Sequence, residues 1–147
     1  MAKAGALFLM ALCLLASGCD YGSTSPSTGG SARYDGEWSG TTSQGRPITF
    51  KVSSDQKVTA ISVGYNFNGC SGQNTFANLN LAIGTPPNPG SPSLGPGFGF
   101  GSGPPDAANY TQVLGNFTAP TTATGSVVFA AFAGCGNSGG IWTATKR

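Results

Sequence analysis

The side chains that could carry acid–base chemistry are few in this sequence. None of its 147 residues is a histidine, which removes the commonest general base and the histidine-activated serine and cysteine nucleophiles. The five carboxylates are Asp20, Asp35, Glu37, Asp55 and Asp106. Asp35 and Glu37 stand two positions apart, as a pair of glycosidase carboxylates could. On a β-strand they would share one water-facing side, where nothing raises a pKa, so we predict a solvated face and no catalytic residue.

The residues also argue against metal, nucleotide and nucleic-acid binding. The sequence has no Cys-x-x-Cys motif and no histidine, so we expect no metal site. Segment 97–103 is rich in glycine but lacks the Lys-Ser/Thr pair and the helix of a phosphate-binding loop, so we expect no cofactor. The formal net charge is +2 and the basic residues are scattered, so nucleic acid is not an expected partner.

The first 18 residues have the layout of a secretory signal peptide. Lys3 supplies the positive start, and residues 4–15 form an uncharged apolar run. This run is well short of the ~20 apolar residues that a membrane-spanning helix needs. Ala16 and Gly18 satisfy the small-residue rule for cleavage before Cys19. We therefore predict a signal peptide at 1–18.

The residues before Cys19 read Leu15-Ala16-Ser17-Gly18. They resemble a bacterial lipobox, with Ala16 in the position that usually holds leucine. The resemblance implies a lipoprotein, in which the Cys19 thiol accepts a diacylglyceryl group and acyl chains anchor the mature chain to a membrane of the bacterial cell envelope. Asp20 resembles an inner-membrane retention signal of enteric bacteria, and both inner and outer membrane remain open. The alternative is a secreted protein with Cys19 as an unpaired thiol.

Two segments have the composition of linkers. Residues 19–33 are rich in Ser, Thr, Gly and Pro without apolar periodicity, which predicts a lipidated start and a flexible tether. Residues 84–105 form a Pro/Gly/Ser stretch inside the domain. A stretch of that length without regular structure is unusual in a compact domain, so we expect a disordered or flexible loop, or a functional one.

The remainder, 34–147, has the texture of an all-β domain. Short runs alternate apolar and polar residues between turn signals, and no segment has a helical period. We expect about seven strands, at 34–42, 48–52, 57–67, 77–83, 109–118, 125–133 and 141–146. They predict an antiparallel β-sandwich or a small up-and-down β-barrel, in which the first and last strands pair.

The cysteines that remain after signal removal and lipidation are Cys70 and Cys135. An even pair in an oxidising compartment predicts one disulfide. It would close a loop of about 65 residues and contribute roughly 4 kcal/mol in the chain-entropy model. Each cysteine follows a similar strand end, Phe67-Asn68-Gly69 and Phe132-Ala133-Gly134, so the two ends are expected to meet at one end of the domain.

Several runs resemble a bacterial extracytoplasmic β-sandwich module of uncharacterised function. They are Gly36-Glu37-Trp38-Ser39-Gly40-Thr41, Ile48-Thr49-Phe50-Lys51-Val52, Gly115-Asn116-Phe117 and Trp142-Thr143-Ala144-Thr145. The resemblance covers most of 34–147, and its motifs are strand and turn residues. It implies a fold and no activity.

One strand suggests a binding surface. The run 125–133 is apolar on both sides, with Val128 and Phe132 expected on the same face. An outer strand normally has one solvated face, so something is expected to cover these two residues. Phe98 and Phe100 in the glycine-rich loop either fold over this patch or present an apolar or sugar-stacking surface to a partner.

These observations predict a non-catalytic envelope lipoprotein that acts as a binding or structural module. Its expected contacts are the membrane, through lipid on Cys19, and an envelope protein or polysaccharide. Two alternatives remain. One is a periplasmic inhibitor of an envelope-attacking enzyme, whose loop would plug a cleft, and the other is a carbohydrate-binding module.

Overall fold

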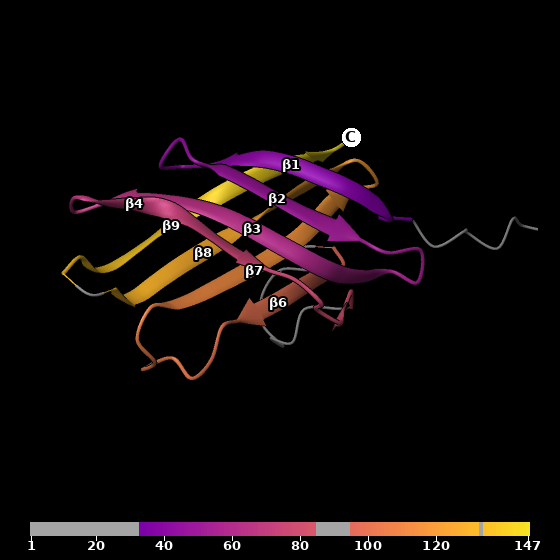
Figure 1. Ribbon diagram of the computed structural model, residues 1–147. Coiled ribbons are helices and arrows are strands. Elements are labelled where there is room, and N and C mark those ends of the chain that lie inside the picture. Colours follow the sequence, from indigo (N-terminus) through magenta and orange to yellow (C-terminus); the bar gives the residue numbers. More distant parts are fainter. Residues whose placement is uncertain (1–32, 85–94, 133) are drawn as a thin grey trace, which may run out of the picture. The chain divides into compact units, whose positions relative to one another are not determined.

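The computed structural model describes residues 33–84, 95–132 and 134–147 (Figure 1). The predicted signal peptide, the lipidation site Cys19 and all of the tether except Arg33 lie outside the described residues. The described part consists of β-strands and contains no helix, so no helix there could span a membrane. Its nine strands are β1 (Gly36–Thr42), β2 (Pro47–Val52), β3 (Lys57–Phe67), β4 (Cys70–Phe76), β5 (Leu81–Ala82), β6 (Gly97–Gly101), β7 (Tyr110–Ala119), β8 (Thr122–Phe132) and β9 (Gly136–Lys146). The all-β prediction is confirmed, with nine strands in place of about seven.

All nine strands belong to one antiparallel sheet, curled into a half-barrel. The order is β4-β3-β2-β1-β9-β8-β7-β6, and the short β5 pairs with the start of β3. Two meanders, β1 to β4 and β6 to β9, are therefore joined where β1 pairs with β9. In Figure 1 the strands of the first meander cross in front of those of the second. The predicted pairing of the first and last strands is confirmed.

The edge strands β4 and β6 approach each other across the open side of the curl, which we call the seam. The rings of Phe76 on β4 and Phe100 on β6 lie 4.5 Å apart between centroids. Asn74 on β4 donates a 2.8 Å hydrogen bond from its side-chain amide to the hydroxyl of Thr111 on β7. Side chains therefore hold much of the seam, in contrast to the continuous backbone ladders elsewhere in the sheet.

Alternating side chains place an aromatic core inside the curl. On β2, Ile48, Phe50 and Val52 are buried while the residues between them are exposed, as period-2 alternation requires. Trp38 stacks on Phe50 with ring centroids 5.3 Å apart, and Phe117 from β7 meets both rings edge-on. The centre of the sheet is thus closed by large rings from both meanders.

Two inward-facing glycines make room for the largest rings. Phe98, Gly115, Gly125 and Trp142 are cross-strand neighbours on β6, β7, β8 and β9. A methyl group on Gly125 would lie 2.5–2.6 Å from the Trp142 ring, and one on Gly115 would lie 2.5–2.6 Å from the Phe98 ring. Glycine at these two positions lets the rings lie flat against the backbone of the neighbouring strands.

Two regions differ from the sequence prediction. β4 lies at 70–76, ahead of the strand predicted at 77–83, of which only β5 forms. Residues 97–101, expected to belong to the loop, form β6 against β7. Residues 85–94 of that loop lie outside the described residues.

Candidate functional site

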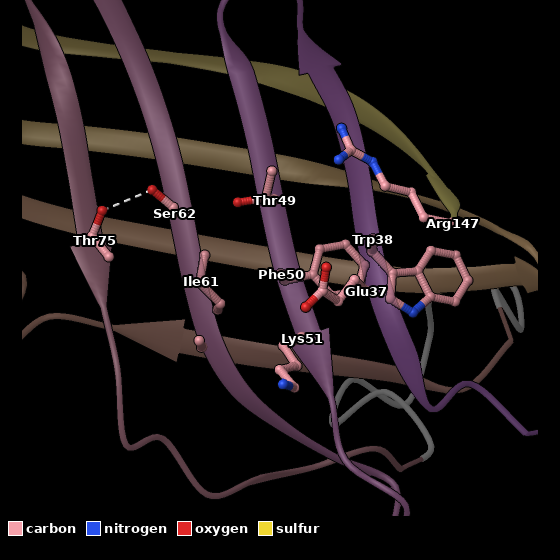
Figure 2. A pocket seen from close by; sticks show the side chains of 10 residues that line it. Glu37, Trp38, Thr49, Phe50, Lys51, Ile61, Ser62, Thr75 and Arg147 are labelled. Atoms are coloured by element: carbon pink, nitrogen blue, oxygen red, sulfur yellow. Dashed lines mark hydrogen bonds between the residues drawn. The ribbon is translucent and has the colours of Figure 1, made fainter.

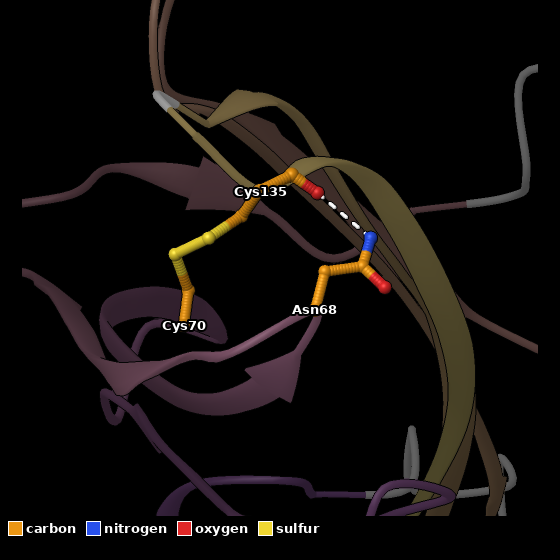
Figure 3. The surroundings of a disulfide bond; sticks show 3 residues. All are labelled: Asn68, Cys70 and Cys135. Carbon is orange, nitrogen blue, oxygen red and sulfur yellow. Dashed lines mark hydrogen bonds between the residues drawn. A yellow bond between two sulfur atoms is a disulfide. The ribbon is translucent and has the colours of Figure 1, made fainter.

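The disulfide between Cys70 and Cys135 is confirmed (Figure 3). It joins the first residue of β4 to the turn between β8 and β9, with the two Cα atoms 6.1 Å apart and a sequence separation of 65. An aromatic cluster of Tyr65, Phe67, Phe129 and Phe132 packs close to this end of the sheet. The bond is structural in position, because Cys135 is buried against the core.

The four residues predicted to form a binding surface do not come together on one face. Phe98 and Phe132 are buried in the core, and Phe100 packs partly buried at the seam. Val128 lies on the outer face, where it is exposed. Phe132 lies on the opposite face of β8 from the one expected. The reason is a shift in the register between Phe129 and Phe132, around Ala131, whose φ is 52°. This β-bulge turns Phe132 inward.

Two of the carboxylates, Asp35 and Asp55, have partners that favour ionisation. Arg33 donates a 3.0 Å hydrogen bond to Asp35, which lowers the pKa of that carboxyl below its ordinary value of 3.8. The hydroxyl of Ser53 donates to Asp55 and lowers its pKa in the same direction. Glu37 is exposed on the outer face of β1. A general acid needs the opposite shift, so neither Asp35 nor Asp55 is suited to that role at neutral pH.

The outer face of the sheet carries a feature that sequence reasoning missed. One hydroxyl side chain from each of six adjacent strands falls in the same cross-strand register. These residues, which we call the hydroxyl row, are Thr75 on β4, Ser62 on β3, Thr49 on β2, Ser39 on β1, Thr145 on β9 and Thr122 on β8. With neighbouring strands about 4.8 Å apart, the row is roughly 24 Å long.

A second, shorter row runs beside it. Thr41 on β1, Thr143 on β9 and Thr124 on β8 are also direct cross-strand neighbours. The three middle strands therefore present two hydroxyl residues each, through the repeated patterns Ser39-x-Thr41, Thr143-x-Thr145 and Thr122-x-Thr124. These patterns were visible in the sequence, but their alignment depends on strand register, which the sequence does not reveal.

Two shallow depressions lie on this outer face, one on each side of β1. The first has a volume of about 350 Å³, and Figure 2 shows Thr75, Ser62 and Thr49 along it on successive strands. Glu37, Lys51 and Arg147 add charge to its lining. The second has a volume of about 360 Å³, and its lining is uncharged and dominated by threonine and serine of both rows. The hydroxyl row links the two.

The hydroxyls differ in what they already bind. At the ends, Ser62 and Thr75 share a 2.8 Å hydrogen bond, and so do Thr118 and Thr122. At the centre, the guanidinium of Arg147 donates a 2.7 Å hydrogen bond to the hydroxyl of Ser39. Within the described residues no hydrogen bond involves the hydroxyls of Thr41, Thr49, Thr143 and Thr145. The centre of the surface thus presents donors and acceptors that are open to a ligand.

The interior of the curl is filled rather than hollow. Trp38, Trp142, Phe117 and Phe129 are among its largest side chains, and each is 2% exposed or less. These buried side chains fill the described part of the curl, and the candidate site lies on the outer face. Among the described residues, no group of three or more His, Cys, Asp or Glu side chains could hold a metal ion.

Comparison with known proteins gives no relative: no family model, no curated protein and no solved structure matches the chain.

Proposed function

We propose that this protein is a non-catalytic module of the bacterial envelope, anchored by lipid on Cys19, that binds its partner through the outer face of the sheet. The observation that carries the proposal is the pairing of a filled interior with a continuous hydroxyl row on the outer face, four of whose six residues are exposed. A ligand carrier needs a cavity, and an enzyme needs reactive groups that converge on one point. This surface instead offers two shallow depressions and a line of hydrogen-bonding side chains, which suits a protein that binds a partner.

The anchor is tested on the full chain produced in a bacterial host that processes lipoproteins. Intact mass should show a mature chain that starts at Cys19 and carries acyl groups, recovered from the membrane fraction. Cys19→Ala should leave the chain without acyl mass and outside the membrane fraction. A wild-type chain of bare mass, recovered from the medium, would contradict the anchor.

The binding face is tested by photo-crosslinking in living cells. A photo-reactive amino acid at Thr49, on the outer face of β2, should give crosslinked products with an envelope component. The matched control carries the same amino acid at Ser54, an exposed residue in the turn between β2 and β3 that lines neither depression. Equal products at both positions, or none at Thr49, would contradict the proposed face.

The inhibitor alternative stays open, because residues 85–94 of the loop that would plug an enzyme cleft lie outside the described residues. Phe98 and Phe100 are not suited to that role, since both belong to β6 and Phe98 packs against Phe50 in the core. The carbohydrate-binding alternative is developed in the next subsection.

We also favour an up-and-down barrel, open at the seam, over a sandwich. Apart from β5, each strand pairs with the next in the chain except across the seam between β4 and β6, and the last pairs with the first. This is the neighbour pattern of an up-and-down barrel, whereas sandwiches typically use Greek-key crossovers.

A further inference from the structure

We propose that the hydroxyl row binds a polysaccharide of low charge, laid across strands β2, β1 and β9, and that the glycan strand of the cell wall is its occupant. This inference rests on the proposed function, because it takes the outer face as the binding face. It adds the chemical class of the ligand and the direction in which the chain lies.

The first argument is the match of hydrogen-bonding groups. A serine or threonine hydroxyl both donates and accepts, and the same is true of a sugar hydroxyl or of the acetamido group of an amino sugar. Thr49, Thr143 and Thr145 are exposed at the centre of the surface with hydroxyls that bind no described residue. Threonine is also stiff at χ1, so little side-chain freedom is lost when a ligand binds.

The second argument is shape. The hydroxyl row crosses the strands in one line of roughly 24 Å, which suits an extended chain better than a compact small molecule. The depressions on the two sides of β1 lie along the same line and are linked by it. A polymer could therefore contact both depressions at once, whereas a monosaccharide would reach one of them.

The third argument is charge. Of the residues that line the two depressions, only Glu37, Lys51 and Arg147 are charged, and all three belong to the first depression. The side chain of Arg147 is already bound to Ser39. A nucleic acid or an anionic membrane surface would need a cluster of cations that the two depressions lack. A ligand of low charge fits what is present.

A protein partner fits less well. The centre of a protein–protein interface is typically built around buried aromatic, Met or Arg anchors. The aromatic rings closest to the first depression, Trp38 and Phe50, are 1% and 3% exposed and face the core.

Without an exposed aromatic ring to stack on, a short glycan would bind this surface weakly. Many contacts along an insoluble polymer would raise the apparent affinity through avidity.

The test uses the full chain, purified from membranes in detergent, and measures co-sedimentation with peptidoglycan sacculi and with chitin. Both polymers carry hydroxyl and acetamido groups, and only sacculi carry charged peptide stems. We expect binding to both, retained in about 0.5 M salt because screening at that ionic strength affects charge pairs and not neutral hydrogen bonds. Binding to sacculi alone, or binding abolished by salt, would mean recognition of the stems and would overturn the proposal.

The variant is Thr49→Val with Thr145→Val, which keeps the shape and the strand preference of each residue and removes only the hydroxyl. Two lost hydrogen bonds should weaken binding to both polymers by at least about tenfold. Ser54→Ala, which removes an exposed hydroxyl in the turn between β2 and β3 and outside both depressions, should bind as the wild type does. The melting temperatures should agree within a few degrees. Unchanged binding of the double variant, or no binding of the wild type to either polymer, would refute the proposed site.

The two proposals fail separately. Sedimentation is measured on purified protein and does not depend on where the cell places the chain. Loss of glycan binding with an intact lipid anchor and with crosslinks from Thr49 to an envelope protein would leave the proposed function standing and remove the glycan.

Discussion

The side-chain amide of Asn68 donates a hydrogen bond of 2.8 Å to the carbonyl oxygen of Cys135, 67 positions further along the chain (Figure 3). Asn68 lies in the turn between β3 and β4, with a φ of 49°, and Cys135 lies in the turn between β8 and β9. The Cys70–Cys135 disulfide joins the first residue of β4, directly after the first turn, to the second turn. One end of the sheet is therefore fastened both by a covalent bond and by a hydrogen bond.

Removal of the disulfide should lower stability substantially. The double variant Cys70→Ser with Cys135→Ser removes a cross-link between residues separated by 65 positions. The chain-entropy model gives such a cross-link a stabilisation of roughly 4 kcal/mol. Urea unfolding should show a lower midpoint for the double variant. Reduction of the wild type should give a similar shift, whereas a midpoint that does not respond to reductant would contradict the prediction.

Phe117 should be among the most sensitive core positions. Its ring meets Tyr34, Trp38, Phe50 and Phe98 and is 2% exposed. Phe117→Ala should lower the free energy of unfolding by about 3–5 kcal/mol, because it removes these contacts and leaves a cavity. Leu114→Ala is the matched control, since Leu114 lies on the same strand but is 42% exposed and should cost about 0.5 kcal/mol or less. Comparable losses for the two variants would contradict the assignment of faces on β7.

Gly125 should not tolerate a side chain. A methyl group there would meet the Leu114 carbonyl oxygen and the Trp142 ring, neither of which can move without disturbing a ladder. Gly125→Ala should therefore destabilise the domain by roughly 1–3 kcal/mol, the usual cost of overpacking. Gly99→Ala, whose new methyl would meet only the flexible end of Leu114 at 3.3 Å, should have a much smaller effect on the melting temperature. Equal shifts would show that the tight approach of Trp142 to β8 is absent.

The ion pair of Asp35 and Arg33 should make the stability of the domain depend on pH in the acidic range. The hydrogen bond from Arg33 depresses the pKa of Asp35 in the folded state, so the unfolded chain binds this proton more readily. The resulting stabilisation is present above the ordinary value of 3.8 and is lost as the pH falls through the lower folded value. Asp35→Asn should thus be slightly less stable than the wild type at pH 7 and equal to it near pH 2. The side chains of Arg33 and Asp35 are 65% and 35% exposed, so solvent screens their interaction and the difference should be small.

A double-mutant cycle provides the control for that ion pair. If the effect comes from Arg33, then Arg33→Gln should reproduce it, and the two changes together should cost no more than one of them. Strictly additive losses in urea unfolding at pH 7 would assign the effect to another partner of Asp35.

The strands that could be predicted from the sequence are those with clean alternation. On β2, the buried residues Ile48, Phe50 and Val52 alternate with exposed ones, so the period-2 pattern identifies the strand. β4 was missed because its sequence, Cys-Ser-Gly-Gln-Asn-Thr-Phe, is mostly polar, as suits an edge strand. β6 was missed because alternating glycines imitate a loop, although Phe98 and Phe100 between them turn to the interior.

The candidate surface was beyond sequence reasoning for a different reason. The alternation along each strand correctly places Thr49, Thr143 and Thr145 on solvated positions, but it does not say which residues on neighbouring strands lie side by side. The register that aligns Thr49 with Ser39 and Ser39 with Thr145 is set by turn lengths and by the pairing of β1 with β9. The sequence likewise does not indicate the β-bulge at Ala131, although this bulge determines the face on which Phe132 lies.

The pairing of β1 with β9 also governs the order of events during biosynthesis. The ladder at the middle of the sheet joins Trp38 to Lys146, so β1 has no partner on one side until the final strand has been made. Contacts this distant in sequence close slowly. The two meanders therefore stay unconnected, and the sheet incomplete, until β9 has emerged.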